Sequence, residues 1–383
     1  MQKPVSRNSD SYPITYIAGI DGVRGLCALG IMLGHTRPAL FSGAGIFMEV
    51  FFTVSGYLIT SVLIKDFQER GTISFRRFYF RRAARLYPAL TALIFVFLVL
   101  CWLFSPEFLV RFKEAMLSWF YAMNYARLFT DTPITYLSHT WSLAVEEQFY
   151  LIWPIIFLVL LKWLDLSKRL AIFIFILAGA FWVWRIYLVA AGAPKVHLYT
   201  GFDARADSLL VGCGLAVLLQ VINLNDYPRL WGAAASALLP FFIGFLAVGF
   251  FASTDFAGYY IFSPLCGSLP TAITIVGLQY PNKKMMQFFY GSSAAVFCGQ
   301  LCYGLYIWHY PIFQWIETWA SPRYIVVFLL GWSLTFLAAT LSYLYIEQPI
   351  RKKAATVFRE NGDQLGQTVK SGSMRVGDRG VPL

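Results

Sequence analysis

Ionisable residues lie inside long apolar segments of this chain, most clearly Arg24 and His35 in the run 17–37. They stand eleven positions apart, so a helix would bring them to nearly the same face, about 16 Å apart along its axis. A charge in the hydrocarbon layer is costly unless it lines a polar cavity or meets a partner. The alternative is a buried hydrogen bond between helices. We therefore expect both side chains to face the protein interior.

Composition indicates a membrane protein. The 383 residues are 58% hydrophobic and only 13% charged, which leaves too little polar surface for a soluble globule. The formal net charge is +11, but basic residues cluster in short loops between apolar runs, where they report membrane orientation, and we expect no nucleic acid as partner. The six cysteines show no disulfide or zinc spacing, so we expect no metal and no tightly bound cofactor.

Ten apolar runs have about the length that crosses 30 Å of hydrocarbon. They cover residues 17–37, 44–65, 86–105, 141–163, 169–191, 205–222, 230–251, 258–279, 291–316 and 323–346. The stretch 106–140 is aromatic but interrupted by charges. If it does not span, the basic loops and both termini fall on one face, which is cytoplasmic by the positive-inside rule. We therefore expect 106–140 to lie on the outer side.

These runs predict an all-α polytopic membrane protein, with about ten transmembrane helices around a polar tunnel. Residues 1–16 would form a cytoplasmic N-terminal segment and 17–350 the transmembrane domain. Residues 351–383 are polar, and we expect them to form a flexible cytoplasmic tail.

The predicted topology sorts the unusual polar residues by depth. An outer cluster would contain His35, His139, Glu146, Asp203, Arg205, Asp207 and His309. An inner, cationic cluster would contain Arg24, Arg82 and Arg85. Together they suggest that guanidinium groups hold a phosphate-bearing donor at the cytoplasmic face, and that the donor reacts near the outer face. The arginines between 76 and 85 also fit ordinary positive-inside anchoring.

Seven segments, taken in order, resemble the type-3 membrane acyltransferase family, whose members O-acylate sugars and other hydroxyl compounds with acyl-CoA. They are IDGVRGLCALGIMLGH at 20–35, VFFTVSGYLIT at 50–60, RRFYFRRAARLYPAL at 76–90, HTWSLAVEEQFYLIWP at 139–154, FDARADSLLVGCGLA at 202–216, YGLYIWHYPI at 303–312 and YIEQPIR at 345–351. They cover nearly the whole apolar body. About thirty polar residues follow the last run, so we expect the stand-alone membrane form.

The resemblance implies that acyl-CoA, usually acetyl-CoA, donates to a hydroxyl of a glycan or glycolipid at the outer side of a bacterial inner membrane. It places His35 at the catalytic position, as general base or covalent acyl carrier. A carboxylate would orient the imidazole. Glu146 and Glu147 point about 100° apart on a helix, so only one can easily meet His35; we favour Glu146 and keep Glu147 as the alternative. Donor binding is expected at Arg24, Arg82 and Arg85.

Five further polar residues are weaker candidates for acceptor binding or support. His139 and His309 also fit an interfacial or interhelical hydrogen bond. Asp203, Arg205 and Asp207 fit either the hydroxyl groups of the acceptor or a structural network among themselves. The alternative function is a secondary transporter or flippase of a sugar or lipid without group-transfer chemistry. A transporter should show internal repeats, and none is visible in the sequence.

Overall fold

The structure, a computed structural model, describes residues 17–130, 133–280, 289–319 and 324–356. Within these ranges every regular element is a helix, so the predicted all-α class is confirmed. The predicted N-terminal segment 1–16 and most of the predicted tail 351–383 lie outside the described residues.

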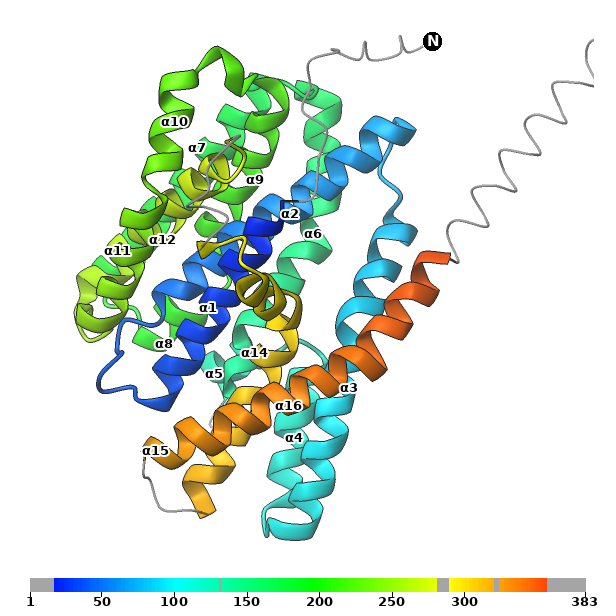
Figure 1. Cartoon of the computed structure of the whole chain (residues 1–383), viewed down its shortest axis with the longest axis vertical. Helices are drawn as coiled ribbons and strands as arrows, with labels where there is room; N and C mark the ends of the chain where they lie inside the picture. The colour runs from blue at the N-terminus through cyan, green and yellow to red at the C-terminus, as the bar shows by residue number, and fades with distance from the viewer. Residues whose placement is uncertain (1–16, 131–132, 281–288, 320–323, 357–383) are drawn as a thin grey trace, which may run out of the picture.

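The helices follow one another along the chain as shown in Figure 1. They are α1 (Ala18–Thr36), α2 (Ile46–Arg70), α3 (Phe75–Phe104), α4 (Phe108–Trp119), α5 (Met123–Phe129), η1 (Ser138–Thr140), α6 (Trp141–Leu164), α7 (Lys168–Ala190), α8 (Lys195–Thr200), α9 (Ala206–Val221), η2 (Leu224–Asp226), α10 (Pro228–Ser236), α11 (Leu238–Phe251), α12 (Ala257–Gly277), α14 (Ser293–Trp319), α15 (Tyr324–Val326), η3 (Val327–Gly331), α16 (Trp332–Ser342) and η4 (Tyr343–Glu347).

Six described helices are long and apolar enough to cross a membrane: α2, α3, η1 with α6, α7, α12 and the continuous helix Tyr324–Thr356. The pair α10 and α11, bent by 42°, is a seventh if it forms one broken span. The protein is therefore a multi-pass membrane protein. The other three predicted runs correspond to α1, α9 and α14, which do not pass this test of length and composition. The ten-span topology thus stays a prediction.

The segment 106–140 does not form a long apolar helix. Its helices α4 and α5 have 12 and 7 residues. At about 1.5 Å per residue, α4 is roughly 18 Å long, too short for a hydrocarbon core of about 30 Å. It packs beside the C-terminal part of α3 at one end of the bundle (Figure 1). This fits the prediction that the segment does not span.

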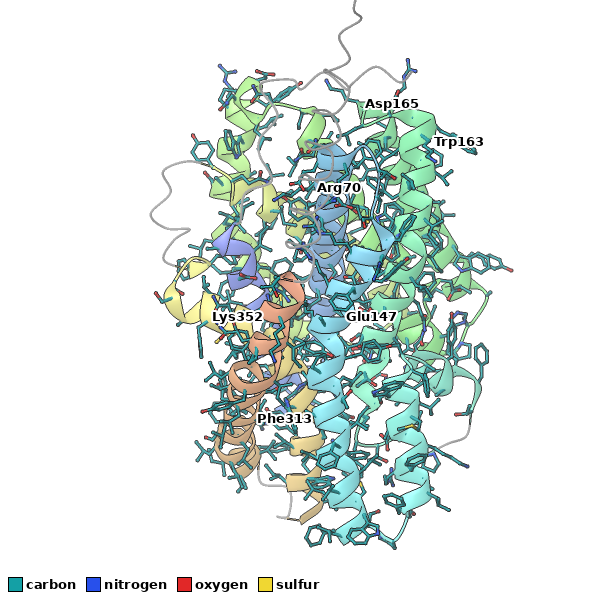
Figure 2. All side chains as sticks on the ribbon, turned by 90° about the vertical axis from the view of Figure 1, so that its right-hand side faces the viewer. Arg70, Glu147, Trp163, Asp165, Phe313 and Lys352 are labelled. Atoms are coloured by element: carbon teal, nitrogen blue, oxygen red, sulfur yellow. The ribbon has the colours of Figure 1, made fainter. Side chains whose placement is uncertain are left out.

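Outer helices present apolar side chains outward. Only 22% of the most apolar window of α7 is buried, and its Ile172, Ile176 and Val183 are 58–65% exposed. Such a surface suits contact with lipid tails rather than water. Asp165 lies at one end of the bundle, whereas Glu147 lies at mid-height (Figure 2). A charge such as Glu147, which is less than 20% exposed, needs a polar partner in the interior.

Helices α1 and α14 pack backbone to backbone in the interior. A Cβ atom on Gly25 would lie 2.5 Å from the carbonyl oxygen of Ala295, and one on Gly299 would collide with the carbonyl of Asp21. Glycine permits this close approach because it has no side chain. The polar residues that lower the hydropathy of α1 and α14 include Arg24, His35 and His309. The contact therefore fixes two predicted site helices against each other.

Candidate active site

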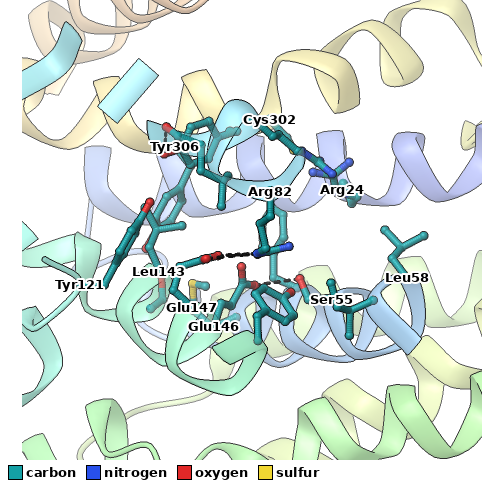
Figure 3. A pocket seen from close by; sticks show the side chains of 18 of the residues that line it. Arg24, Ser55, Leu58, Arg82, Tyr121, Leu143, Glu146, Glu147, Cys302 and Tyr306 are labelled. Carbon is teal, nitrogen blue, oxygen red and sulfur yellow. Dashed lines mark hydrogen bonds and ion pairs between the residues drawn. The ribbon is translucent and has the colours of Figure 1, made fainter. Parts of the chain in front are cut away.

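A cavity of about 140 Å³, which we call the arginine chamber, lies among α1, α2, α3, α6 and α14 (Figure 3). Its wall holds every predicted catalytic and donor-binding residue except His35: Arg24, Arg82, Arg85, Glu146 and Glu147. Apolar and aromatic side chains such as Phe51, Leu86 and Tyr150 complete the wall. The structure thus combines the predicted cations with the predicted carboxylates in one cavity.

Glu147 pairs with Arg82. The Nε of Arg82 donates to Oε1 of Glu147 at 2.8 Å, and both side chains are less than 20% exposed. The same guanidinium lies over the ring of Tyr150, 3.4 Å from the ring centroid. This ion pair joins α3 to α6. Because its charge is already compensated, Arg82 is a weaker candidate for a phosphate ligand than the sequence suggested.

Arg85 lies one turn further along α3 and differs from Arg82. Within the part of the chain that the structure describes, no hydrogen bond or ion pair engages the half-buried Arg85. Arg24 donates to Oδ1 of Asp21 at 3.1 Å. A guanidinium offers five N–H donors in a planar fork that matches phosphate. The chamber can therefore take up an anionic group at Arg85, with Arg24 nearby in the same wall.

A second cavity of about 170 Å³, the histidine chamber, contains His35. Its wall combines imidazole, aromatic and cationic side chains: His35, Arg127, His139, Trp141, Tyr199, Tyr306 and Tyr310. They come from α1, α5, η1, α6, α8 and α14. No aspartate or glutamate is among the described residues that line this chamber. Its ionisable groups are therefore one guanidinium, imidazoles and phenols.

Hydrogen bonds set the tautomers of His35 and His309. The Nδ1 of His309 lies 3.0 Å from the carbonyl oxygen of Leu305, which can only accept, so this Nδ1 carries the proton. The Nε2 of neutral His309 then accepts from the Nδ1–H of His35 at 2.9 Å. Consequently the Nε2 of His35 keeps its lone pair, and no described residue bonds to it. This nitrogen can act as a base or as a nucleophile.

The two chambers adjoin. Met48 of α2 and Tyr306 of α14 line both cavities. The hydroxyl of Tyr306 donates to the carbonyl oxygen of His139 at 2.7 Å and lies 2.6 Å from Oγ of Ser142. Arg24 and His35, eleven residues apart on α1, line the two chambers in turn. The polar interior predicted from that pair is therefore present as two neighbouring cavities.

The predicted contact between Glu146 and His35 is not found among the described residues. Glu146 accepts from Oγ of Ser55 at 2.8 Å and lines the arginine chamber, whereas His35 lines the histidine chamber. The reason is axial depth. His139, at the level of His35, precedes Glu146 by seven residues, about 10 Å along the helix. The direction in which a side chain points from its helix could not reveal this difference in depth between the two helices. Glu147 does not replace it, since its partner is Arg82.

His139 lines the histidine chamber, and His309 is bonded to His35 in its wall. His309 is fully buried and is the hydrogen-bond partner of His35. The interhelical hydrogen bond predicted as one alternative is therefore present, and it is made to the candidate catalytic residue. His139 lies 3.2 Å through its Nε2 from the carbonyl oxygen of Ile307. Its ring stacks on Tyr310, with 4.9 Å between centroids. Neither residue is merely interfacial.

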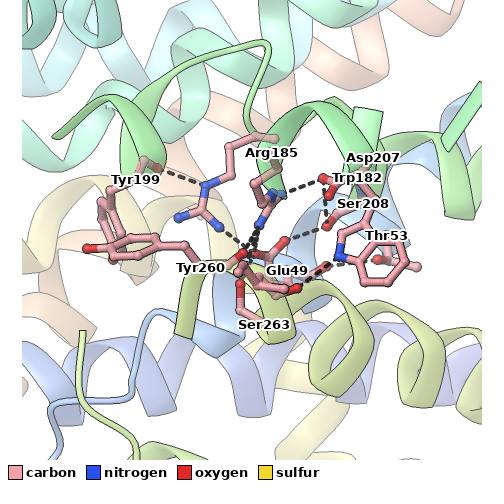
Figure 4. A network of polar contacts seen from close by, with 11 residues as sticks. Glu49, Thr53, Trp182, Arg185, Tyr199, Asp207, Ser208, Tyr260 and Ser263 are labelled. Carbon is pink, nitrogen blue, oxygen red and sulfur yellow. Dashed lines mark hydrogen bonds and ion pairs between the residues drawn. The ribbon is translucent and has the colours of Figure 1, made fainter. Parts of the chain in front are cut away.

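A buried charge network joins α2, α7, α9 and α12 (Figure 4). Glu49 at its centre is fully buried and binds both Arg185 and Arg205, and it accepts from Ser263 at 2.9 Å. Asp207 pairs with Arg185. Two buried guanidiniums thus meet two carboxylates, which removes the cost of isolated charges in a low-dielectric interior.

The three acidic and basic residues predicted near the start of α9 do not pair with one another. Arg205 bonds to Glu49 and to the carbonyl of Tyr199, and Asp207 pairs with Arg185. Asp203 instead accepts from Nε1 of Trp184 at 2.9 Å and lies 3.0 Å from Nε2 of His197. The reason is that side chains on neighbouring turns meet other helices before they meet each other. None of the three lines either chamber.

Sequence reasoning missed three charged residues. Glu49 and Arg185 lie within predicted apolar runs, so the criterion that singled out Arg24 would have found both. Arg127 lies in 106–140 among aromatic residues, and no pattern there distinguishes it from an interfacial anchor. Across the described residues no cluster of His, Cys, Asp or Glu could hold a metal ion.

Comparisons with known proteins agree on one family. The chain matches the model of an acyltransferase domain over residues 17–347. It is 31% identical to peptidoglycan O-acetyltransferase OatA of Listeria monocytogenes over 366 residues, which cover 90% of this chain and 57% of that protein. It is 30% identical to O-acetyltransferase OatA of Staphylococcus aureus over 392 residues, which cover 96% of this chain and 63% of that protein. No solved structure matches.

The family match spans the helices that carry both chambers, from α1 to η4. The chain itself spans about three fifths of the length of these two relatives. The order of the seven sequence segments and the extent of the match lead to the same assignment. The chain belongs to the type-3 membrane acyltransferase family.

Proposed function

We propose that the protein is an O-acyltransferase that moves an acyl group, acetyl in the usual case, from cytoplasmic acyl-CoA to a hydroxyl of a glycan or glycolipid at the outer side of the bacterial inner membrane. The observation that carries this proposal is the free Nε2 of His35, which His309 leaves unprotonated in a cavity next to the arginine chamber. The named activity of the relatives, O-acetyl transfer, supports the same reaction.

The donor would occupy the arginine chamber. Arg85, which has no partner among the described residues, would bind a phosphate of acyl-CoA, and Arg24 would add positive charge. The extended pantetheine arm is comparable in length to the roughly 16 Å between Arg24 and His35 along α1. It would pass Met48 and Tyr306 and present the thioester in the histidine chamber. The whole donor need not cross the membrane.

The acceptor would enter the histidine chamber from the other side. The Nε2 of His35 takes the proton of the acceptor hydroxyl while that oxygen attacks the thioester carbon. The carbon–sulfur bond then breaks, and the CoA thiolate receives the proton from the imidazolium. The products are an ester and free CoA. His309 holds the Nδ1–H of His35 throughout, so that the reactive nitrogen is the one that faces the substrates.

Replacement of His35 tests this function. We expect His35→Gln to lower transfer of radiolabelled acetyl from acetyl-CoA into cell-surface material by about 100-fold or more, as loss of a general base does. His197→Gln is the matched control, because His197 bonds to Asp203 and lines neither chamber. It should keep activity within about twofold. Near-normal transfer by His35→Gln would contradict the catalytic role of His35. Label that crosses the membrane unreacted in the unmodified protein would favour a transporter or flippase instead.

The orientation is a separate part of the proposal. Single cysteines placed beside Arg82 in a cysteine-free background should react with a membrane-impermeant maleimide only from the cytoplasm. Cysteines placed in α4, such as Phe112→Cys, should react only from outside. Phe112 is 42% exposed, so a thiol there lies on the surface of the bundle. Labelling of α4 from the cytoplasm would invert the topology and remove the proposed donor path.

A further inference from the structure

Arg127 of α5 is a cation in the histidine chamber, and no described residue pairs with it. Its side chain is half-buried and lines the same cavity as His35. Among the residues that the structure describes, no hydrogen bond or ion pair reaches its guanidinium. An uncompensated charge in such a place is unfavourable, and proteins retain it where an anion arrives. We therefore expect an anion to bind at Arg127.

The neighbouring carboxylates are already occupied. Glu49 binds Arg185 and Arg205, and Glu114 binds Arg111 and accepts from the backbone N–H of Thr135 at 3.0 Å. The Nδ1–H of His35 is already donated to His309, and His139 lies within hydrogen-bond distance of the carbonyl oxygen of Ile307 through its Nε2. Other polar hydrogens in the wall are partly used, since the hydroxyl of Tyr306 donates to the carbonyl of His139. Arg127 is thus the one cationic group in the described wall of this chamber.

Acyl transfer creates an anion in this chamber. When the acceptor oxygen attacks the thioester carbon, the electron pair of the C=O bond moves onto the carbonyl oxygen. The pair returns when the carbon–sulfur bond breaks and CoA thiolate leaves. Donors positioned for this transient oxyanion commonly contribute 10²–10³-fold, roughly, to turnover. We propose that Arg127 is that donor, and that its N–H groups bind the oxyanion formed beside His35. This inference rests on the proposed function.

A rival occupant is a permanent anionic group on the acceptor, such as a carboxylate. The two roles of Arg127 predict different binding of the CoA donor when no acceptor is present. An oxyanion donor acts on the acyl end of CoA even when no acceptor is present, whereas an acceptor-binding arginine does not. CoA derivatives with different acyl ends can therefore separate the two.

The test compares two stable CoA thioethers. Carboxymethyl-CoA carries an anionic oxygen near the place where the oxyanion develops, and S-ethyl-CoA carries none. With purified protein and no acceptor, we expect carboxymethyl-CoA to bind at least about tenfold more tightly, as a charge-assisted hydrogen bond allows. Arg127→Met should reduce this ratio to about one and leave S-ethyl-CoA binding unchanged. Arg127→Lys should give an intermediate ratio.

Arg37→Met is the matched control. Arg37 is an exposed cation just after α1, and its guanidinium lies 5.0 Å from the ring centroid of Tyr324. Its loss should leave the binding ratio at the wild-type value. Under saturating acetyl-CoA, Arg127→Met should also lower the rate of CoA release about 100-fold, with KM for acetyl-CoA within threefold.

Two results would overturn the inference. An unchanged binding ratio in Arg127→Met, together with lost transfer, would assign Arg127 to the acceptor. Equal binding of the two thioethers by the unmodified protein would show that no cation meets the acyl end. If neither thioether bound the unmodified protein, the acyl-CoA donor of the proposed function would itself be wrong. That failure is distinct, because it would appear before any substitution is made.

Discussion

The arginine chamber and the histidine chamber use charge in opposite ways. In the arginine chamber Glu147 neutralises Arg82, and Glu146 accepts from Ser55. In the histidine chamber no carboxylate lines the described wall, where the imidazoles of His35 and His139 accompany the single guanidinium of Arg127. The first chamber therefore carries resident anions as well as cations. In the mechanism proposed above, the second receives its negative charge from the reaction.

Under the proposed function, this difference assigns donor binding to the arginine chamber and the chemical step to the histidine chamber. A phosphate-bearing donor needs cations that act in the ground state, and Arg85 provides one in the arginine chamber. The reacting group needs a neutral base and a cation that acts on a transient charge. A carboxylate in the histidine chamber would compete for Arg127, and it would also stabilise the protonated form of the imidazoles, which cannot act as a base. The distribution of acidic side chains is thus part of the proposed function.

Among the substitutions that test this contrast between the chambers, His309 is expected to give the largest effect. His309→Leu should reduce turnover about 100-fold, because the Nδ1–H of His35 then loses its acceptor and the reactive tautomer is no longer fixed. His309→Gln should recover at least a tenth of wild-type activity, since a side-chain carbonyl can accept the same hydrogen. Acetyl transfer measured in both variants checks the order. Equal loss in the two variants would reduce His309 to a packing residue.

A carboxylate added to the histidine chamber should remove the contrast between the chambers. Ser138 lines this chamber and is half-buried. Ser138→Asp should lower turnover about tenfold or more by pairing with Arg127, while KM for acetyl-CoA stays unchanged. Ser138→Asn has the same size without the charge and should stay within about twofold of wild type. Similar rates for Asp and Asn would mean that the missing carboxylate is incidental.

The smallest expected effect concerns the two arginines of α3. Arg85→Ala should raise KM for acetyl-CoA about tenfold and leave thermal stability unchanged, since no described partner loses a contact. Arg82→Ala should lower the melting temperature as well, because Glu147 is left without its counter-ion. Donor titrations and thermal unfolding in detergent measure both. If Arg85→Ala is the less stable variant, the charge assignments in this chamber are reversed.

The sequence predicted the fold class and most of the candidate site. Apolar runs located the helices, and depth along those runs separated Arg24 from His35. The seven segments identified the family. The apolar runs and the depths along them are local features, so spacing and composition are enough to infer them, whereas the family was inferred from resemblance.

The pairing of side chains between helices could not be predicted. Glu146 and His35 were expected to meet, but a difference of about two turns in depth places them in different chambers. The partners of Arg205 and Asp207 come from α2 and α7, at sequence separations of 156 and 22 residues. Such contacts depend on the relative register of helices, which a single sequence does not specify. The same reason hid Arg127 from the sequence analysis.

Met48 and Tyr306 stand where the two chambers meet. If the chambers open to opposite faces, as proposed, these two side chains also form the barrier to water and ions between the two sides of the membrane. A voltage of 100 mV drives each elementary charge with about 2.3 kcal/mol, so a continuous file of water past them would leak protons. Under this proposal the protein must therefore block ion leakage while the pantetheine arm of the donor enters and leaves in every catalytic cycle. An acyltransferase in free solution has no such requirement.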